Sequence, residues 1–412
     1  NSKDDIEKFG IDKFNKEAYD SVMTYEKEWQ AIIPRLGRFV DMEANYKTMD
    51  TAYTESVWWA WKNLYDKGLA YEGYKIMHIC PRCETTLAQS EVGMEYTDVT
   101  DISVTAKFEL VDEPGTFVLA WTTTPWTLPG NTALAVNKEF DYVKVESENN
   151  FYILAKERVE DAFKGKEYKI VEGLKGESLV GKSYKPLFNY FVNKEIDLPA
   201  QAGNKENIYK IWYADFVTLD TGVGVVHIAP AFGEDDMNLA KANNIPVIKH
   251  VNFQGEFIKE VTDFAGKKVK QKDDTQSADI EIIKWLAHNG LLFEKEKIVH
   301  SYPLCWRCKT PLLNYATSSW FVDVPKLKPR LIEENQNITW VPSHVKEGRF
   351  GKWLEGAREW AVSRNRFWGA PLPIWKCEEC EEVKVIGSLT ELAEGKKSKN
   401  NYFFISIYML MP

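Results

Sequence analysis

Residues 79–84, which read Ile-Cys-Pro-Arg-Cys-Glu, decide how this chain is organised, because a matching stretch follows far downstream. Residues 304–309 read Leu-Cys-Trp-Arg-Cys-Lys and keep the same spacing and the same arginine. Two thiolates from one tight turn can occupy two corners of a tetrahedron, and two such turns close a metal site with no open coordination position. We therefore predict one structural Zn²⁺ per chain, with two unrelated knuckles or reduced buried thiols as the alternative. The predicted ligands are Cys80, Cys83, Cys305 and Cys308.

The separation of the two pairs predicts an inserted domain. If the four cysteines share one ion, the ends of the intervening chain must return close together, as they do when one domain is inserted into another. Residues 1–98 read mostly helical, short β runs punctuated by turns begin at residue 99, and a Trp-rich texture returns at residue 298. We predict an α/β fold in which residues 1–98 and 298–395 form an outer domain, residues 99–297 a β-rich insert, and residues 396–412 an aberrant tail.

Composition limits the class of protein. The chain has 412 residues, 44% of them hydrophobic and 27% charged, which is typical of two or three globular domains. The formal net charge of −9 does not indicate a nucleic-acid partner, although a local basic face could still bind one. No apolar run reaches the roughly 18 residues of a spanning helix, and no signal peptide is apparent. We expect a reducing, cytoplasmic location without membrane contact, where C-x-x-C favours zinc over a disulfide.

Three features suggest a piece of a longer protein. The chain begins at Asn1 instead of Met, and a third pair, Cys377 and Cys380, has no partner pair left. We expect the missing ligands of that pair to lie beyond residue 412. From Tyr402 the sequence turns apolar and continues no earlier pattern. A frameshift or truncation explains this tail, and a short buried strand is the alternative.

Two further stretches carry candidate chemistry. Residues 121–131 (WTTTPWTLPGN) place three consecutive threonines ahead of a turn fixed by proline. The threonines either only complete the end of a strand, as β-branched residues often do, or form a polar surface that orients a water molecule. Residues 222–236 (GVGVVHIAPAFGEDD) predict a strand that ends at His227, a turn, and a helix that opens after Gly233. The acids at 234–236 favour a helix N-terminus by charge–dipole attraction, and a histidine at a strand end is often simply hydrogen-bonded.

Together these two stretches resemble the editing domain of isoleucyl-tRNA synthetases. Residues 55–92 and 358–375 are similar to the flanking parts of the class I catalytic domain, so the resemblance covers about residues 5–390. The valyl and leucyl relatives typically carry Thr-Thr-Arg-Pro where this chain has Thr-Thr-Pro-Trp at residues 123–126. The resemblance implies an incomplete Rossmann-like catalytic domain, interrupted by a β-rich, barrel-like α+β editing domain with the zinc knuckle at the junction.

The resemblance also implies roles for individual residues in the hydrolysis of mischarged valyl-tRNA-Ile. Asp236 matches the carboxylate that anchors the α-ammonium of the misattached amino acid, and His227 matches the histidine that excludes isoleucine. The remaining matches are the pocket threonines Thr122, Thr123 and Thr124, and the loop residues Trp126 and Asn131. Ester hydrolysis here needs no metal and no covalent nucleophile.

The synthetic site is expected to be incomplete. No H-x-G-H motif occurs, the anticodon-binding domain is absent, and the Lys-Lys-Ser-Lys-Asn of residues 396–400 resembles the mobile K-M-S-K-S loop by coincidence. Isoleucine, ATP and Mg²⁺ are therefore ligands of the intact enzyme only. Trp368 is expected to line the isoleucine pocket, whereas Trp58 and Trp59 are expected to pack in the core.

Three functions remain in competition at this point. The first is an editing hydrolase fragment, a monomer that acts on tRNA-Ile. The second is a tRNA-binding module or remnant with no activity alone. The third is a zinc-dependent hydrolase, which requires an open metal position that four cysteines do not leave.

Overall fold

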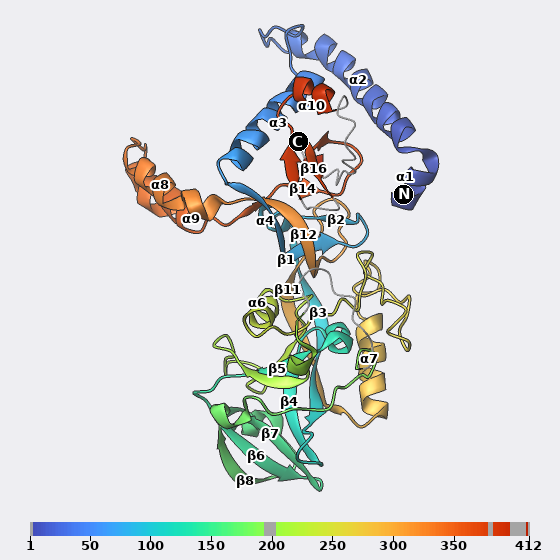
Figure 1. Cartoon of the computed structure of the whole chain (residues 1–412), viewed down its shortest axis with the longest axis vertical. Helices are drawn as coiled ribbons and strands as arrows, with labels where there is room; N and C mark the ends of the chain where they lie inside the picture. Colours follow the sequence, from blue (N-terminus) through green and yellow to red (C-terminus); the bar gives the residue numbers. More distant parts are fainter. Residues whose placement is uncertain (1–2, 193–202, 378–381, 396–408, 411–412) are drawn as a thin grey trace. The chain divides into compact units, whose positions relative to one another are not determined.

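The computed structural model describes residues 3–192, 203–377, 382–395 and 409–410. The chain divides into two compact units (Figure 1). The first unit takes residues 1–74, 83–89 and 318–412, and the second takes residues 75–82 and 90–317. The predicted domain boundaries at residues 98 and 297 fall inside strands β3 (Tyr96–Glu109) and β11 (Leu292–Pro303) of the second unit, so the division into functional domains stays a prediction.

The described helices are α1 (Lys3–Phe9), α2 (Ile11–Arg35), α3 (Thr51–Asp66), α4 (Gln89–Val92), α5 (Val159–Ala162), α6 (Glu234–Ala242), α7 (Ser277–His288), α8 (Val324–Gln336), α9 (Gly351–Glu355) and α10 (Leu389–Gly395). A four-stranded sheet has the order β13 (Trp360–Ala361), β12 (Leu313–Val322), β1 (Ala70–Cys80), β2 (Thr85–Thr86). The short strands are β14 (Ser363–Arg364), β15 (Ala370–Pro371), β16 (Ile374–Lys376), β17 (Val383–Val385) and β18 (Met409–Leu410).

Helix α3 shows how tryptophan spacing builds the core of the first unit. Trp58 and Trp61 lie one turn apart on the buried face of the helix, and Trp61 packs edge-on against Trp320 at 5.9 Å between ring centroids. Trp58 also donates its indole N–H to the carbonyl oxygen of Pro371 at 2.7 Å. Trp59 points about 100° away from Trp58 around the helix and is 65% exposed. The prediction that Trp59 packs in the core is therefore wrong.

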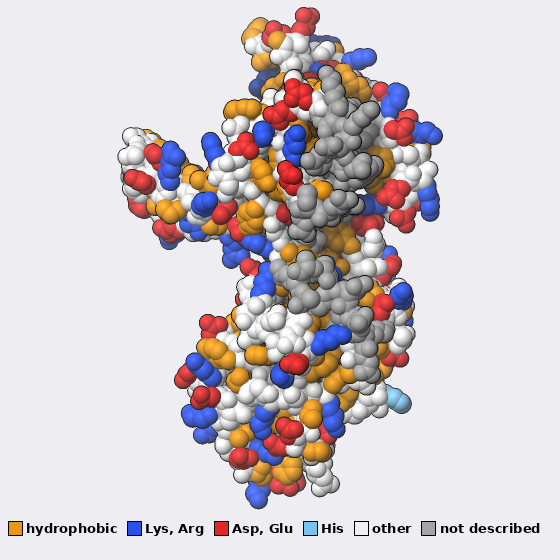
Figure 2. Space-filling view, viewed as in Figure 1, with side chains coloured by type: hydrophobic (Ala, Val, Ile, Leu, Met, Phe, Trp, Pro, Cys, Tyr) orange, Lys and Arg blue, Asp and Glu red, His pale blue; other side chains and the backbone are white. Residues whose placement is uncertain are grey.

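The second unit is built on a nine-stranded mixed sheet. Its main path is β8 (Lys169–Lys175), β6 (Asp141–Ser147), β7 (Asn150–Ala155), β4 (Thr116–Thr122), β10 (Val225–Ile228), β5 (Ala133–Val136), β9 (Lys210–Tyr213). Off this path, β3 (Tyr96–Glu109) pairs with both β4 and β11 (Leu292–Pro303). Figure 1 shows α7 running alongside β3 and β11, and Figure 2 shows acidic and basic side chains interspersed on the visible face of this unit.

Strand β10 brings the two candidate stretches together. It pairs in parallel with β4, with Val226 opposite Trp121, and antiparallel with β5, with His227 opposite Leu134. The connection from β4 to β5, which includes the 3₁₀ turn Pro125–Gly130, therefore passes beside the end of β10. Parallel pairing places the C-terminal ends of β4 and β10 at the same edge, so the threonines and His227 meet there.

The predicted α/β content and the β-rich second unit are confirmed. The helix predicted after Gly233 begins at Glu234. Residues 396–400 and most of the predicted aberrant tail lie outside the described residues. Among the described residues, no helix combines the length and the apolarity that a membrane crossing requires.

Candidate active site

A directed chain of hydroxyl hydrogen bonds runs through the threonine-rich loop. Thr127 Oγ1 donates to the carbonyl oxygen of Thr124 at 2.8 Å. Its oxygen must then accept from Thr124 Oγ1 at 3.3 Å, and Thr124 in turn accepts from Thr122 Oγ1 at 3.3 Å. Each hydroxyl has one proton, so this assignment leaves a single direction of donation through the loop.

Asn131 fixes the tautomer of His227. Asn131 Nδ2 lies 2.8 Å from the carbonyl oxygen of Ala133, which can only accept, so the amide orientation is settled. The same nitrogen lies 2.8 Å from His227 Nδ1, which must therefore accept a hydrogen bond. His227 Nε2 then carries the proton and donates to Thr127 Oγ1 at 3.0 Å. Tyr184 holds the amide from the other side by donating to Asn131 Oδ1 at 2.6 Å.

His227 is consequently a neutral ring whose two nitrogens are both engaged. Burial, which would strip the cation of its hydration, and the nearby His250 together lower its pKa to about 3. A neutral ring with an occupied Nδ1 is poorly suited to accept a proton from water. Its ring carbons can form a rigid wall of a pocket, which agrees with a role in measuring side-chain size.

Asp236 presents a carboxylate in the first turn of α6. It is the third residue of α6, and its Oδ2 accepts the backbone N–H of Ala229 at 2.8 Å. The side chain folds over Gly233, where an added Cβ would lie 2.7 Å from Asp236 Cγ. Burial raises the pKa of Asp236 to about 6, against the lowering effect of that N–H. No lysine or arginine within the described residues forms an ion pair with this carboxylate, so an added cation would be favoured here.

Thr123 differs from its neighbours in the loop. Thr122 is buried and hydrogen-bonded, whereas Thr123 and Thr124 are half-buried. Among the described residues, the Thr123 hydroxyl has no hydrogen-bond partner within the protein. It is thus the threonine hydroxyl best placed to bind a water molecule or a substrate.

Trp126 is held at both of its peptide groups by buried side chains that sequence reasoning missed. Its N–H donates to Asp279 Oδ1 at 2.9 Å, and its carbonyl oxygen accepts from His250 Nε2 at 2.9 Å. The indole is 3% exposed and packs edge-on against Phe232 at 5.1 Å between ring centroids. Asp279 reads as an ordinary first-turn acid of α7 and His250 belongs to no motif, so neither gave a signal in the sequence.

Trp368 lies in the first unit, half-buried in a bend between β14 and β15. Its role in a synthetic pocket stays a prediction, as do the substrate contacts of Trp126 and Asn131. The structure places those two residues as supports of the loop and of the His227 ring.

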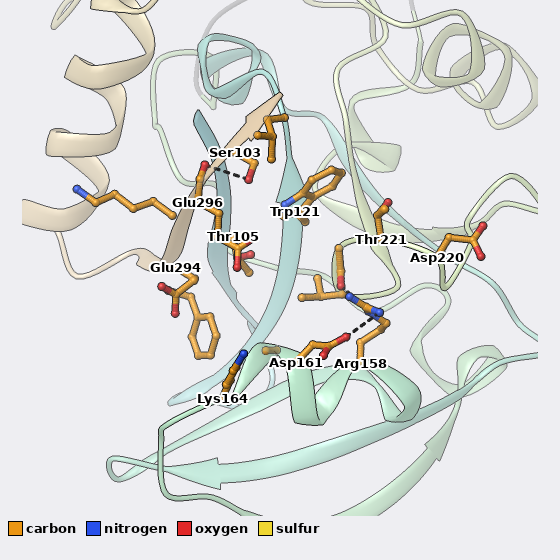
Figure 3. Close-up of a pocket in the computed structure, with 16 residues that line it drawn as sticks. Ser103, Thr105, Trp121, Arg158, Asp161, Lys164, Asp220, Thr221, Glu294 and Glu296 are labelled. Atoms are coloured by element: carbon orange, nitrogen blue, oxygen red, sulfur yellow. Dashed lines mark hydrogen bonds and ion pairs between the residues drawn. The ribbon is translucent and has the colours of Figure 1, made fainter. Parts of the chain in front are cut away.

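A separate cavity of about 420 Å³ opens on the other face of β4. Trp121 and Thr105 face each other across β4 and β3 and both line it, whereas Thr122 points to the opposite face of the strand. Figure 3 shows Arg158 joined to Asp161 in this cavity, and the two side chains form an ion pair of 2.9 Å. None of the site residues predicted from the sequence lines it.

The two C-x-x-C turns meet. The sulfur atoms of Cys80, Cys83, Cys305 and Cys308 all lie within 4.8 Å of one another, and three of the four residues are buried. The two turns also match in backbone, because Glu84 and Lys309, each four residues after the first cysteine, have φ of 50° and 60°. Zn–S bonds of about 2.3 Å in a tetrahedron separate sulfurs by roughly 3.8 Å, so this donor set fits zinc. The third pair is described only at Cys377, since Cys380 lies outside the described residues.

Comparison with known proteins identifies relatives along almost the whole chain. The family model for tRNA synthetases class I (I, L, M and V) matches residues 1–403. The isoleucine–tRNA ligase of Treponema denticola is 46% identical and is matched over 96% of this chain and 38% of its own length. That of Clostridium tetani is 44% identical over 95% of this chain and 36% of its own length. The chain thus spans somewhat more than a third of these curated relatives.

Solved structures give a weaker likeness. The editing domain of the P. knowlesi cytosolic leucyl-tRNA synthetase matches 34% of this chain and 62% of its own, at 14% identity and a TM-score of 0.26. The corresponding P. falciparum domain matches 33% of this chain and 64% of its own, at 13% identity and a TM-score of 0.25.

Proposed function

The chain belongs to the class I tRNA synthetases of the isoleucine, leucine, methionine and valine group, and from this membership we propose that it is the editing-domain-containing part of an isoleucine–tRNA ligase. The isoleucine assignment is supported by relatives of that name at 43–46% identity. The proposed activity is hydrolysis of valyl-tRNA-Ile by the second unit. Activation of isoleucine with ATP and Mg²⁺ is proposed for the intact enzyme only.

The observation that carries the proposal is the carboxylate of Asp236 in the first turn of α6, which forms no ion pair with the described residues and follows the fixed ring of His227 closely in the chain. Every aminoacyl ester carries an α-ammonium, and a half-buried carboxylate that forms no ion pair with the described residues favours binding one. Asp236 Oδ2 accepts the N–H of Ala229, two residues after His227. An ammonium at Asp236 would therefore bring the amino-acid side chain near a neutral, rigid imidazole.

Hydrolysis then requires only water and orientation. The water oxygen bonds to the ester carbonyl carbon, and collapse of the tetrahedral intermediate breaks the bond to the ribose oxygen, which takes one proton. Thr123 and Thr124 have half-buried hydroxyls that can hold that water at the loop surface. Positioning of this kind can supply a large part of the rate.

Size exclusion explains why a second site is needed. Valine differs from isoleucine by one methylene, which in this enzyme family is known to be worth about 1–3 kcal/mol in the synthetic pocket. The synthetic pocket must favour isoleucine over valine, whereas an editing pocket whose wall admits valine and excludes isoleucine makes the opposite selection. The fixed tautomer of His227 gives that wall one defined shape.

Zinc, partners and architecture complete the proposal. Cys80, Cys83, Cys305 and Cys308 would hold one Zn²⁺, which would cross-link the two C-x-x-C turns and leave no position for substrate. The closed donor set disfavours a zinc-dependent hydrolase. We also propose the interrupted Rossmann-like arrangement of residues 1–98, 99–297 and 298–395, tRNA-Ile as partner, a monomeric state, and a cytoplasmic location.

The deciding experiment is deacylation of purified Val-tRNA-Ile and Ile-tRNA-Ile by the 412-residue chain. We expect selective hydrolysis of the valyl ester, lost in Asp236→Ala and kept in Asp235→Ala, since Asp235 is the exposed neighbour on the same helix. Binding of tRNA in a gel shift without hydrolysis would instead identify a binding module. Equal hydrolysis by Asp236→Ala and wild type would refute the assigned role of the carboxylate.

A further inference from the structure

A buried ion cluster lies behind the threonine-rich loop. Lys270 is 2% exposed, and its Nζ lies 2.8 Å from Asp101 Oδ1 and 3.0 Å from Asp279 Oδ2. Asp101 also contacts His300 Nε2 through Oδ2 at 2.9 Å. Burying charges costs several kcal/mol per ion, so a buried cluster is weak evidence for a stabilising role. A role for the cluster other than stabilisation is therefore to be sought in its contacts.

The two carboxylate oxygens of Asp279 have different partners. Oδ2 contacts Lys270 within the cluster, whereas Oδ1 points out of the cluster to the threonine-rich loop. Asp279 Oδ1 accepts the N–H of Trp126, two residues after Thr124. Lys270 holds the other oxygen, so the carboxylate cannot rotate without losing an ion pair. The position of the Thr122–Thr127 hydroxyl chain is thereby tied to α7.

We propose that Asp279, held by Lys270, is a positioning residue for editing: it fixes the threonine-rich loop so that the attacking water is correctly aimed, and it touches no substrate. This inference rests on the proposed function. It assigns a second carboxylate to the reaction and separates its role from that of Asp236, which is proposed to bind the ammonium.

Asp101 is a matched control. It is as buried as Asp279, at 2% exposure, and its Oδ1 contacts the same lysine, Lys270. Its Oδ2, however, contacts His300 and not the threonine-rich loop. Asp101→Ala and Asp279→Ala each remove one carboxylate from Lys270. Any cost that arises from the cluster alone is shared by both variants.

The expected result is a split in the kinetics of valyl-tRNA deacylation. Asp279→Ala should lower kcat about 10- to 100-fold with KM changed less than about twofold, since small misplacements of reacting groups have effects of this size. Asp101→Ala should keep kcat within about threefold once its folded fraction, measured by thermal unfolding, is taken into account. Equal losses of kcat in the two variants, or an unchanged Asp279→Ala, would overturn the proposal.

Two further measurements cover the case in which Asp279→Ala folds poorly or the wild type is inactive. The double variant Lys270→Met with Asp279→Asn removes the Lys270–Asp279 ion pair, leaves Asp101 with His300, and keeps an amide oxygen for the Trp126 N–H, so kcat should recover relative to Asp279→Ala. Hydrogen exchange of the peptide that covers residues 122–131 needs no activity. Exchange should be faster in Asp279→Ala than in Asp101→Ala, and equal exchange would refute the loop-holding role. An inactive wild type would refute the proposed function while exchange still tests this inference.

Discussion

The Nδ2 atom of Asn131 lies 2.8 Å from Nδ1 of His227 and donates to it. This contact fixes the ring as the Nε2–H tautomer, because the same amide nitrogen also serves the carbonyl oxygen of Ala133 at 2.8 Å. A side chain of the loop after β4 thus determines which face and which edge of an imidazole on β10 are presented.

The first prediction concerns this contact. Asn131→Ala leaves His227 Nδ1 and the Tyr184 hydroxyl without their partners, so the free energy of unfolding should fall by about 1–3 kcal/mol. The ring should also become mobile, and hydrolysis of Ile-tRNA-Ile should rise relative to Val-tRNA-Ile. Urea unfolding and paired deacylation assays measure both effects. Tyr184→Phe, which removes only the outer bond, should cost less and keep the discrimination; equal loss of discrimination would contradict the role of Asn131.

The second prediction is a pH dependence. The pKa of Asp236 is raised to about 6, so its carboxylate is mostly protonated at pH 5 and ionised at pH 7. The value of kcat/KM for Val-tRNA-Ile should therefore rise through pH 6 and level off above pH 7. N-acetyl-valyl-tRNA carries no ammonium and should show a smaller rise in the same window. An identical profile for the two substrates would contradict the prediction, because the pH dependence would then not come from ammonium binding. Asp279 would be the alternative source, since burial also raises its pKa to about 6 and it would affect the hydrolysis of both substrates equally.

The third prediction concerns stability at the same residue. Because the pKa of Asp236 rises from 3.8 to about 6 on folding, the folded state binds more protons between these values, and the free energy of unfolding falls as pH rises through them. Above that window the ionised carboxylate costs up to about 3 kcal/mol. Asp236→Asn should therefore stabilise the chain at pH 7, should lose this advantage at pH 4, and should abolish editing. Urea unfolding at the two pH values tests the sign, with the exposed Asp235→Asn as the control that should change the pH dependence less.

The fourth prediction concerns the cysteine cluster. Metal analysis of the purified chain should find one zinc per chain, and Cys80→Ser should lose it together with several degrees of thermal stability, because four thiolates within 4.8 Å form one closed donor set. Cys377→Ser should keep the zinc. Two zinc ions per chain would show that Cys377 finds ligands beyond those predicted.

The sequence predicted those parts of the site that local patterns encode. The C-x-x-C spacing predicted the meeting of four sulfurs, and Gly233 marked the residue before the start of α6. The pairing of β4 with β10 was not predicted from the residues. The family resemblance supplied it indirectly, by assigning the threonines and His227 to one pocket.

The parts that could not be predicted depend on single side chains that act across long separations. Asp279 lies 153 residues from the peptide group that it holds, and His250 lies 124 residues from the carbonyl oxygen of the same Trp126. An isolated acid in the first turn of a helix has an adequate local explanation as a partner of the helix dipole. The prediction for Trp59 failed because it was based on local composition. A Trp-rich helix suggested burial, but only the position of Trp59 around the helix axis decides its exposure.

The fifth prediction follows from the close approach of Gly130 and His250. A Cβ added at Gly130 would lie 2.1 Å from His250 Nδ1, so Gly130→Ala must displace a buried ring that also donates to the Trp126 carbonyl oxygen. Overpacking of this kind costs about 1–3 kcal/mol, and the lost support of the loop should lower kcat for valyl-tRNA deacylation as well. Gly173→Ala is the matched control, because a Cβ there meets nothing within 4 Å on the exposed strand β8. Thermal unfolding should show a lower midpoint for Gly130→Ala only, and equal midpoints for the two variants would mean that His250 can move away without cost and does not fix the loop.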